Sequence, residues 1–254
     1  MSPRVLVPRP VGRAEGLLSA LAAQGLNGEH HPFLELVPEH DGDLREAVED
    51  LAAGAFSWLV LTSPAAITAL AALGEGPAAA LDVPPSTRIA VVGDGTAEAL
   101  RAAGQEPALI ASGSGEALVR EMPDPESGEE TMLFAASSAA APTVPDGLAQ
   151  RGYRVRREIA YRPRAASVDP QAVRDLLHGR FAAILLTSSM IARMAASLPI
   201  HLSTQVVTIG APTTSAAHAA GLRVDAEADR PDDAALARAA RTAIDTATDT
   251  AKES

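Results

Sequence analysis

The sequence predicts an α/β protein made of two similar halves, each a parallel β-sheet flanked by helices. Short apolar runs alternate with Ala- and Leu-rich amphipathic segments, which is typical of parallel strands joined by helices. Several apolar runs are continuous rather than alternating, as in strands covered on both faces. The chain also repeats its own motifs in the same order. Together these observations predict a duplicated, flavodoxin-like architecture.

The expected strands are the apolar runs, and helix-like segments follow most of them. The strands cover residues 5–7, 58–61, 89–92, 132–134, 183–186 and 206–209. The helices cover residues 12–24, 64–73, 96–103, 143–151, 189–198 and 213–220. Glycine stands where the left-handed residue after a helix is expected, at Gly25, Gly104, Gly152 and Gly221.

The internal repeat consists of three matched segments. The pairs are 56–63 with 181–188, 92–104 with 209–221 and, more loosely, 5–25 with 132–152. A two-fold duplication of an α/β unit explains all three. Chance similarity between Ala- and Leu-rich segments does not predict Thr-Ser and Gly-x-x-Thr in the same order twice.

The connections between the halves are expected in two stretches. Residues 32–43 and residues 159–164 are the candidate linkers. The run 123–130, rich in Asp, Glu, Pro and Gly, predicts a surface loop inside the first copy. The tail after residue 237 is rich in Ala, Thr and Asp and predicts a last helix that frays.

Composition excludes several classes of function. The chain has 254 residues, enough for one large domain or for two of about 100–150 residues. The net charge is −11 without a run of Lys or Arg, which argues against a nucleic-acid partner, because phosphate neutralisation needs a basic face. The absence of cysteine excludes disulfides, thiolate nucleophiles and Cys-ligated metals. Because aromatic residues make up only 3% of the sequence, the core is expected to consist of Ala, Leu, Val and Ile.

No membrane partner is expected either. The first residues lack the apolar region and the cleavage pattern of a signal peptide. Residues 51–74 carry no charge and are long enough to span a bilayer, but Thr62, Ser63 and Pro64 lie in their middle. These residues suit a buried strand, a turn and a helix better than a spanning helix. We therefore expect a cytoplasmic protein.

Conventional catalytic motifs are absent from the sequence. The six histidines show no metal-ligand spacing, and neither G-x-S-x-G nor a Walker A motif occurs. Gly93 and Gly95 follow a strand as in a dinucleotide-binding loop, but Glu98 replaces the third glycine of that motif. Neither a metal nor a cofactor is expected.

Small hydroxyl side chains at strand-to-helix junctions are the remaining candidates for ligand binding. They are Thr62, Ser63, Thr96, Thr187, Ser188 and Thr213, beside the turn glycines Gly93 and Gly210. Ligands of open α/β sheets bind at this edge, where unpaired backbone amides and the helix dipole favour anions. Hydroxyl groups add donors without charge, so two facing copies would suit a ligand with several carboxylates. Ser and Thr are also ordinary helix N-caps, and the sequence leaves both interpretations open.

Two further side chains are candidates for contact with a ligand. Tyr161 lies in the second connection, where its phenol could donate a proton or a hydrogen bond, although a packing role is the commoner one. Arg9 follows the first strand and could meet a carboxylate, although a solvated Arg is the commoner outcome.

Six short motifs occur in the order and at the spacing of a known family. They are Val-Pro-Arg-Pro at 7–10, Leu-Thr-Ser-Pro at 61–64, Val-Gly-Asp-Gly-Thr-Ala at 92–97, Ala-Tyr-Arg at 160–162, Leu-Thr-Ser at 186–188 and Ile-Gly-Ala-Pro-Thr at 209–213. Each is short, but the ordered set spans nearly the whole chain and resembles the uroporphyrinogen-III synthase family, whose enzymes cyclise the linear tetrapyrrole hydroxymethylbilane. Ser189 stands where the family usually has proline, and Ala211-Pro212 shifts the usual Gly-Pro-Thr-Thr by one place. This leaves open whether Thr213 or Thr214 holds the family's position.

The resemblance implies two domains, each with a parallel sheet flanked by helices, joined by a two-stranded ladder. The first domain would comprise residues 1–36 and 163–254 and the second residues 37–162, with the active-site cleft between them. The resemblance also implies a reaction without metal or cofactor: loss of the ring A hydroxyl as water, an azafulvene, and closure through a spiro intermediate that inverts ring D. Tyr161 would assist departure of the hydroxyl. Arg9 and the hydroxyl and glycine positions given above would bind the substrate.

Two other kinds of protein share part of this pattern. A non-catalytic bilobal module that binds a small polycarboxylate or tetrapyrrole shares the duplicated units and the cleft. Such a module usually carries an export signal or a fused output domain, and neither is expected from this sequence. A regulatory homologue fused to a DNA-binding domain requires a basic helix-turn-helix, and none is apparent after residue 221. A monomer is expected, because the sequence shows no large apolar face that would be exposed.

Overall fold

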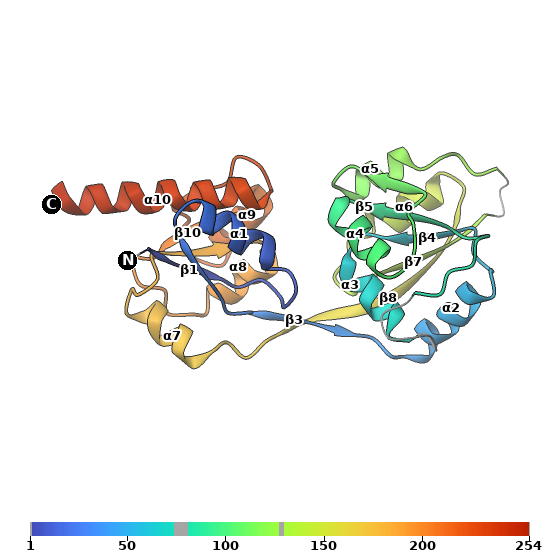
Figure 1. Ribbon diagram of the computed structural model, residues 1–254, viewed down its shortest axis with the longest axis horizontal. Coiled ribbons are helices and arrows are strands. Elements are labelled where there is room, and N and C mark those ends of the chain that lie inside the picture. Colours follow the sequence, from blue (N-terminus) through green and yellow to red (C-terminus); the bar gives the residue numbers. More distant parts are fainter. Residues whose placement is uncertain (1, 74–80, 127–129, 254) are drawn as a thin grey trace. The chain divides into compact units, whose positions relative to one another are not determined.

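The computed structural model describes residues 2–73, 81–126 and 130–253, and the chain forms two compact units. The terminal unit comprises Met1–Glu35 and Arg164–Ser254, and the central unit comprises Leu36–Pro163. Both are built from parallel strands with helices between them, apart from the strand β3 described next (Figure 1). The predicted fold class is confirmed.

The chain passes from one unit to the other in two neighbouring strands. These are β3 (Leu34–Pro38) and β8 (Arg154–Ala165). Backbone hydrogen bonds join Glu39 N to Ala160 O and Ala166 N to Phe33 O. Residue numbers fall along one strand as they rise along the other, so the pair is antiparallel. The two segments predicted to be linkers therefore contain hydrogen-bonded strands, and residue 42 already begins a helix.

The terminal unit holds a five-stranded parallel sheet in the order β11-β10-β9-β1-β2. Its strands are β1 (Arg4–Val7), β2 (Asn27–His30), β9 (Ala183–Leu186), β10 (Gln205–Thr208) and β11 (Ala226–Glu227). Its helices are α1 (Glu15–Ala23), α7 (Pro170–Leu177), α8 (Ser189–Ala195), α9 (Ala211–Ala219) and α10 (Asp233–Glu253).

The central unit holds a six-stranded sheet in the order β3-β8-β7-β4-β5-β6. Besides β3 and β8, its strands are β4 (Trp58–Leu61), β5 (Arg88–Val92), β6 (Leu109–Ala111) and β7 (Thr131–Ser137). Its helices are α2 (Gly42–Ala52), α3 (Pro64–Ala71), α4 (Asp94–Ala102), α5 (Gly115–Glu121) and α6 (Thr143–Gln150).

Each sheet is buried on both faces, which explains the continuous apolar runs. Val5 and Val7 pack with α1 and α10, whereas Leu6 between them packs with α7, α8 and α9. In the central unit, Leu59 packs with α2, α3 and α4, whereas Val60 packs with α5 and α6. All five side chains are fully buried, so successive residues of one strand serve two separate cores.

The strand order carries the predicted duplication. By the matched segments, β1, β9 and β10 of the terminal unit correspond to β7, β4 and β5 of the central unit. The order β2-β1-β9-β10-β11 then repeats as β8-β7-β4-β5-β6. The two copies differ in where the chain enters this order, because the terminal unit starts at the strand that the central unit reaches near its end. The glycines expected to end helices, Gly25, Gly104, Gly152 and Gly221, all have positive φ, between 70° and 97°.

Two other expectations are tested by these elements. Residues 51–73 form the end of α2, strand β4 and helix α3, and none of the helices described is long and apolar enough to cross a membrane. The surface-loop prediction for 123–130 fails at its last residue. Glu130 is buried and lies 3.3 Å from the Arg88 guanidinium, and residues 127–129 are outside the described part of the chain.

Candidate active site

The central unit places a Thr-Ser turn at the carboxyl end of β4. Thr62 and Ser63 are half-buried and follow the last strand residue directly. Ser63 is the N-cap of α3, and its Oγ accepts a hydrogen bond from Ala65 N at 3.2 Å. The capping interpretation therefore applies to Ser63, and its oxygen still lies at the edge where ligands of open sheets bind.

The Tyr161 hydroxyl reaches this turn from β8. Tyr161 lies opposite Ser137 of β7, where the register between the two strands shifts. Tyr161 is 8% exposed and belongs to the core that α2, α3 and α4 form on one face of the sheet. Its Oη donates a hydrogen bond to Ser63 Oγ at 3.1 Å. Two predicted site residues separated by 98 positions in sequence are thus brought into contact.

The neighbouring turn of the central unit is built on a glycine. Gly93 is the N-cap of α4 with φ 74° and ψ 159°, a conformation that disfavours any side chain. A Cβ there would meet no atom within 4 Å, so the backbone angle and not the space requires glycine. Thr96 is only 4% exposed, and its amide donates to Gly93 O at 3.2 Å. The turn backbone is therefore more accessible at this edge than the Thr96 side chain.

The terminal unit repeats this arrangement at the carboxyl ends of β9 and β10. Thr187 is half-buried, and Ser188 caps α8 by accepting from Ile191 N at 3.2 Å. Gly210 is the N-cap of α9, in an extended conformation that does not require glycine. Thr213 is 4% exposed, as is its counterpart in the central unit.

Arg9 is engaged within the terminal unit. Its Nη2 lies 2.6 Å from Asp233 Oδ1 at the start of α10, and its Nη1 donates to Arg13 O at 3.3 Å. The carboxylate expected beside Arg9 is thus supplied by the protein, and a ligand carboxylate would have to share or displace it.

The predicted residues form two sets, one at the carboxyl edge of each sheet. The central set is Thr62, Ser63, Gly93, Thr96 and Tyr161, and the terminal set is Arg9, Thr187, Ser188, Gly210 and Thr213. Sequence reasoning noted Ser189 only as a departure from the family's proline and gave it no role. Its Oγ donates to Pro212 O at 3.0 Å and so links the starts of α8 and α9. Sequence reasoning missed Ser137 at the end of β7, whose Oγ accepts from Ala139 N at 3.1 Å. The match between segments 5–25 and 132–152 could have indicated Ser137, because it aligns Ser137 with Pro10, the residue after Arg9.

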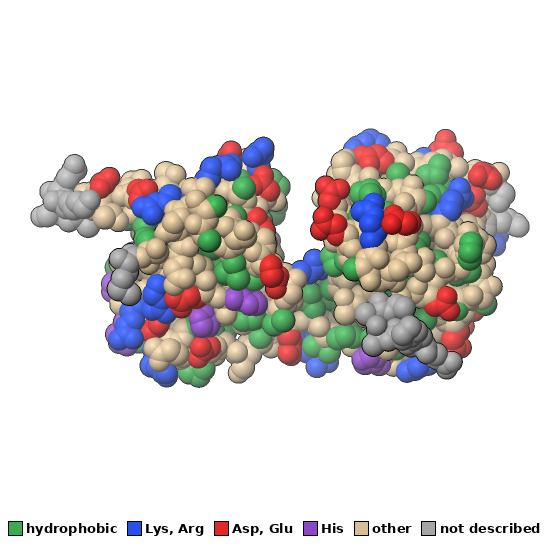
Figure 2. All heavy atoms as spheres, in the orientation of Figure 1, with side chains coloured by type: hydrophobic (Ala, Val, Ile, Leu, Met, Phe, Trp, Pro, Cys, Tyr) green, Lys and Arg blue, Asp and Glu red, His purple; other side chains and the backbone are tan. Residues whose placement is uncertain are grey.

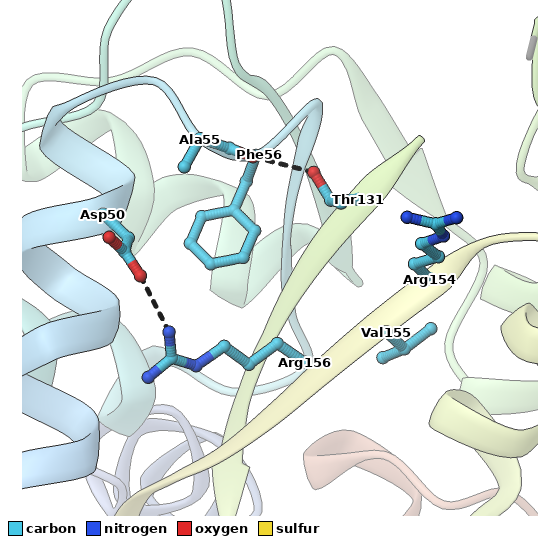
Figure 3. A pocket seen from close by; sticks show the side chains of 7 residues that line it. All are labelled: Asp50, Ala55, Phe56, Thr131, Arg154, Val155 and Arg156. Atoms are coloured by element: carbon cyan, nitrogen blue, oxygen red, sulfur yellow. Dashed lines mark hydrogen bonds and ion pairs between the residues drawn. The ribbon is translucent and has the colours of Figure 1, made fainter. Parts of the chain in front are cut away.

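A cavity of about 340 Å³ lies at the opposite edge of the central sheet (Figure 3). Its lining residues are Asp50, Ala55, Phe56, Thr131, Arg154, Val155 and Arg156. Thr131 and Arg154 are the first residues of β7 and β8, so the cavity opens at the amino end of the strands. The Arg156 guanidinium is held there by Asp50, with Nη1 and Oδ2 2.8 Å apart. The cavity is therefore separate from the candidate site.

Charge and metal-ligand chemistry add little at these edges. Acidic and basic side chains are mixed over each unit on the face drawn in Figure 2, without a continuous basic patch. Within residues 2–73, 81–126 and 130–253, no group of three or more His, Asp or Glu side chains could hold a metal ion. Apart from Arg9, which is paired with Asp233, the predicted site residues offer a ligand uncharged hydroxyls and turn amides.

Fold and site together define a duplicated, doubly wound α/β protein with hydroxyl-bearing turns at both carboxyl edges. The family model described as uroporphyrinogen-III synthase HemD matches residues 15–238. The chain belongs to the uroporphyrinogen-III synthase family, which confirms the resemblance seen in the sequence.

Individual relatives agree with this assignment. The chloroplastic uroporphyrinogen-III synthase of Oryza sativa subsp. japonica is 31% identical over 230 residues, covering 87% of this chain and 74% of the relative. Uroporphyrinogen-III synthetase from Helicobacter pylori 26695 superposes with a TM-score of 0.65 at 14% identity, covering 95% of this chain and 99% of that structure. A mutant synthase from the extremely thermophilic bacterium Thermus thermophilus gives a TM-score of 0.60 at 18% identity, covering 96% of this chain and 100% of that structure. These two structures share the fold.

Proposed function

We propose that this chain converts hydroxymethylbilane to uroporphyrinogen III, with loss of one water and inversion of ring D. The observation that carries the proposal, beyond membership of the family, is the hydrogen bond between Tyr161 Oη and Ser63 Oγ at the carboxyl edge of the central sheet. It holds a proton donor beside a cluster of neutral groups that suits an acidic ligand.

In this proposal, Tyr161 acts on the bond that must break first. With substrate bound, the Tyr161 hydrogen turns from Ser63 Oγ to the ring A hydroxyl, and the Ser63 hydroxyl donates to Tyr161 Oη in its place. The ring A hydroxyl takes this proton as its carbon–oxygen bond breaks, and it leaves as water. Ring D attacks the resulting azafulvene to form the spiro intermediate. The bond between ring D and the rest of the chain then breaks and forms again at the other α-carbon of that ring, so the ring is inverted. The proton lost from this carbon restores the phenol or passes to solvent. Tyr161 is suited to this role because its contact with Ser63 fixes the direction of the phenol.

Apart from this proton transfer, the main task of the protein in this proposal is to position the substrate. The linear substrate is reactive and can close to the uninverted isomer without the enzyme, so the protein has to hold its two ends in the inverting geometry. We assign the binding of the acetate and propionate groups to turn amides and hydroxyls at the carboxyl edges of both sheets. Arg9 would take part by exchanging Asp233 for a substrate carboxylate.

The proposal includes a monomer that works in the cytoplasm without metal or cofactor. A particle of 26.0 kDa by light scattering, and full activity after dialysis against a chelator, are the expected results. A dimer would contradict the proposed monomer. Activity that is lost on dialysis and restored only by added metal would contradict the proposed metal-free reaction.

One assay tests the proposed reaction. Freshly generated hydroxymethylbilane is supplied to the protein, and the product is oxidised and separated into type I and type III isomers by chromatography. The type III isomer is expected in excess over a protein-free control. Only the type I isomer would indicate a non-catalytic module, the alternative of another class.

Replacing Ser63 with alanine removes two contacts, the cap on α3 and the hydrogen bond with Tyr161. Loss of the α3 cap should cost about 1 kcal/mol of stability. Loss of the partner of Tyr161 should also lower turnover about three- to tenfold, because the phenol is no longer fixed in direction. Turnover and thermal unfolding are measured on the same preparations.

Ser114→Ala is the matched control for this variant. Ser114 caps α5 of the same unit by accepting from Ala117 N at 3.1 Å, and it has no place in the site. It should lose similar stability and keep its turnover. An equal loss of turnover in both variants would reduce the role of Ser63 to that of a cap.

A further inference from the structure

A chain of hydrogen bonds joins three elements at the carboxyl edge of the terminal sheet. Thr208 Oγ1 at the end of β10 lies 2.6 Å from Thr214 Oγ1 in α9. The Thr214 hydroxyl in turn donates to Glu227 Oε2 at the end of β11. A carboxylate only accepts and Thr214 has one hydroxyl hydrogen, so the Thr208 hydroxyl must donate to Thr214. This polar relay, Thr208–Thr214–Glu227, has a single direction and ends on a carboxylate.

In the central unit, the positions that correspond to the polar relay are occupied by apolar residues. Strand register pairs Thr208 with Glu227 and, in the central unit, Val91 with Ile110. The matched segments place Ala97 where the terminal unit has Thr214. All three members of the polar relay therefore correspond to apolar residues, and Val91 and Ala97 are fully buried. The fold itself does not need the relay.

Polar residues that the fold does need are shared by both copies. Thr204 at the entry to β10 is fully buried and donates to Phe181 O at 2.8 Å. Thr87, its counterpart at the entry to β5, is buried and donates to Phe56 O at 2.7 Å. A buried threonine with a structural role was thus kept in both copies, whereas the polar relay occurs in one. This contrast indicates a role specific to the terminal edge.

We propose that Glu227 is a positioning residue for substrate binding, acting through Thr214 and Thr208 on the Gly210 turn. Thr208 is two residues before Gly210, and the Thr214 amide donates to Gly210 O at 3.1 Å. The polar relay therefore fixes both sides of the turn whose amides and Thr213 begin α9. The two neighbouring threonines of α9 therefore have different places. Thr213 is buried beside the turn, and the hydroxyl of Thr214 belongs to the polar relay. The inference rests on the proposed function, since the turn is assigned to a substrate carboxylate.

The test rebuilds the apolar corner of the central unit in the terminal unit. In the triple variant Thr208→Val, Thr214→Ala, Glu227→Ile, thermal unfolding should stay close to that of the wild type, because the same residues fill the other copy. KM for hydroxymethylbilane should rise about tenfold, the equivalent of one weakened charge-assisted hydrogen bond, and the share of type I isomer should increase. Glu227→Gln, which keeps an acceptor oxygen, should raise KM less than the triple variant does.

The control is Thr204→Val, which removes a buried hydroxyl at the opposite end of β10. It should lose stability and keep the wild-type KM and isomer ratio. The inference is overturned if the triple variant keeps the wild-type KM and isomer ratio, or if Thr204→Val raises KM as much. Should the triple variant not fold, Glu227→Ile replaces it under the same criteria, because that side chain is exposed. Failure of the wild type to form type III isomer would instead refute the proposed function.

Discussion

Tyr161→Phe should lower the turnover of hydroxymethylbilane about 10- to 100-fold, at or below the low end of what a positioned proton donor contributes. The effect is limited because the substrate loses its hydroxyl readily and can close unaided. The substitution removes only the hydroxyl of a ring that is 8% exposed, so packing in the core should persist. Turnover and isomer ratio are measured by the assay described above, with thermal unfolding on the same preparation.

The other tyrosine of the chain is a matched control. Tyr153 is 4% exposed in the same unit, and its hydroxyl donates to Pro123 O at 2.7 Å. Tyr153→Phe loses a comparable hydrogen bond, worth about 1 kcal/mol of stability, at a position outside the site. It should keep wild-type turnover. Wild-type turnover with an unchanged isomer ratio in Tyr161→Phe would remove Tyr161 from the mechanism.

The strands with a strong apolar pattern could be predicted, and the polar or very short ones could not. Strands β4 and β9 are fully buried on both faces, so their sequences are continuous apolar runs. Strand β2 has the sequence Asn-Gly-Glu-His, and it is a strand only because it pairs with β1 at the edge of the sheet. Tertiary pairing decides such segments, and no local pattern reports it.

The candidate site could be predicted as positions, without its contacts. The repeated Thr-Ser and Gly-x-x-Thr turns mark where each strand ends, and the structure places them at the carboxyl edges. The contact between Tyr161 and Ser63 depends on the order β8-β7-β4, which brings strands distant in sequence together. Likewise, only the packing of α9 distinguishes the buried Thr213 from Thr214, which is tied to Glu227.

A charged network at the other edge of the terminal sheet also escaped sequence reasoning. Arg4 at the start of β1 holds Glu29 through both carboxylate oxygens, with Nε–Oε1 2.6 Å and Nη2–Oε2 2.8 Å. Its Nη2 also lies 2.8 Å from Asp175 Oδ2 on α7. The guanidinium stands 4.5 Å from the centre of the Phe181 ring. One side chain thus joins β2 and α7 to the first strand.

This network gives stability a definite pH dependence. Hydrogen bonds from Arg4 hold the pKa of Asp175 and that of Glu29 below their ordinary values. A carboxyl group with a lowered pKa stabilises the folded state above its unfolded pKa, about 4, and this contribution is lost as pH falls through the folded pKa. The contribution of Arg4 should therefore be complete at pH 7 and decline below about pH 4.

Arg4→Met should accordingly lower the Tm at pH 7 by roughly 5 °C or more, because two carboxylates lose their shared partner. The gap between variant and wild type should narrow as the pH is lowered from 4 to 2, where the carboxyl groups become protonated in both proteins. Thermal unfolding followed by circular dichroism across this range measures it. The control is Arg101→Met, because Arg101 and Glu106 form an ion pair at 3.0 Å with both side chains exposed. Exposed ion pairs contribute at most about 1 kcal/mol, so Arg101→Met should change the Tm little. Arg4 does not carry this stability if Arg4→Met lowers the Tm at pH 7 no more than the control does. The same conclusion follows if the Tm difference between Arg4→Met and the wild type does not depend on pH.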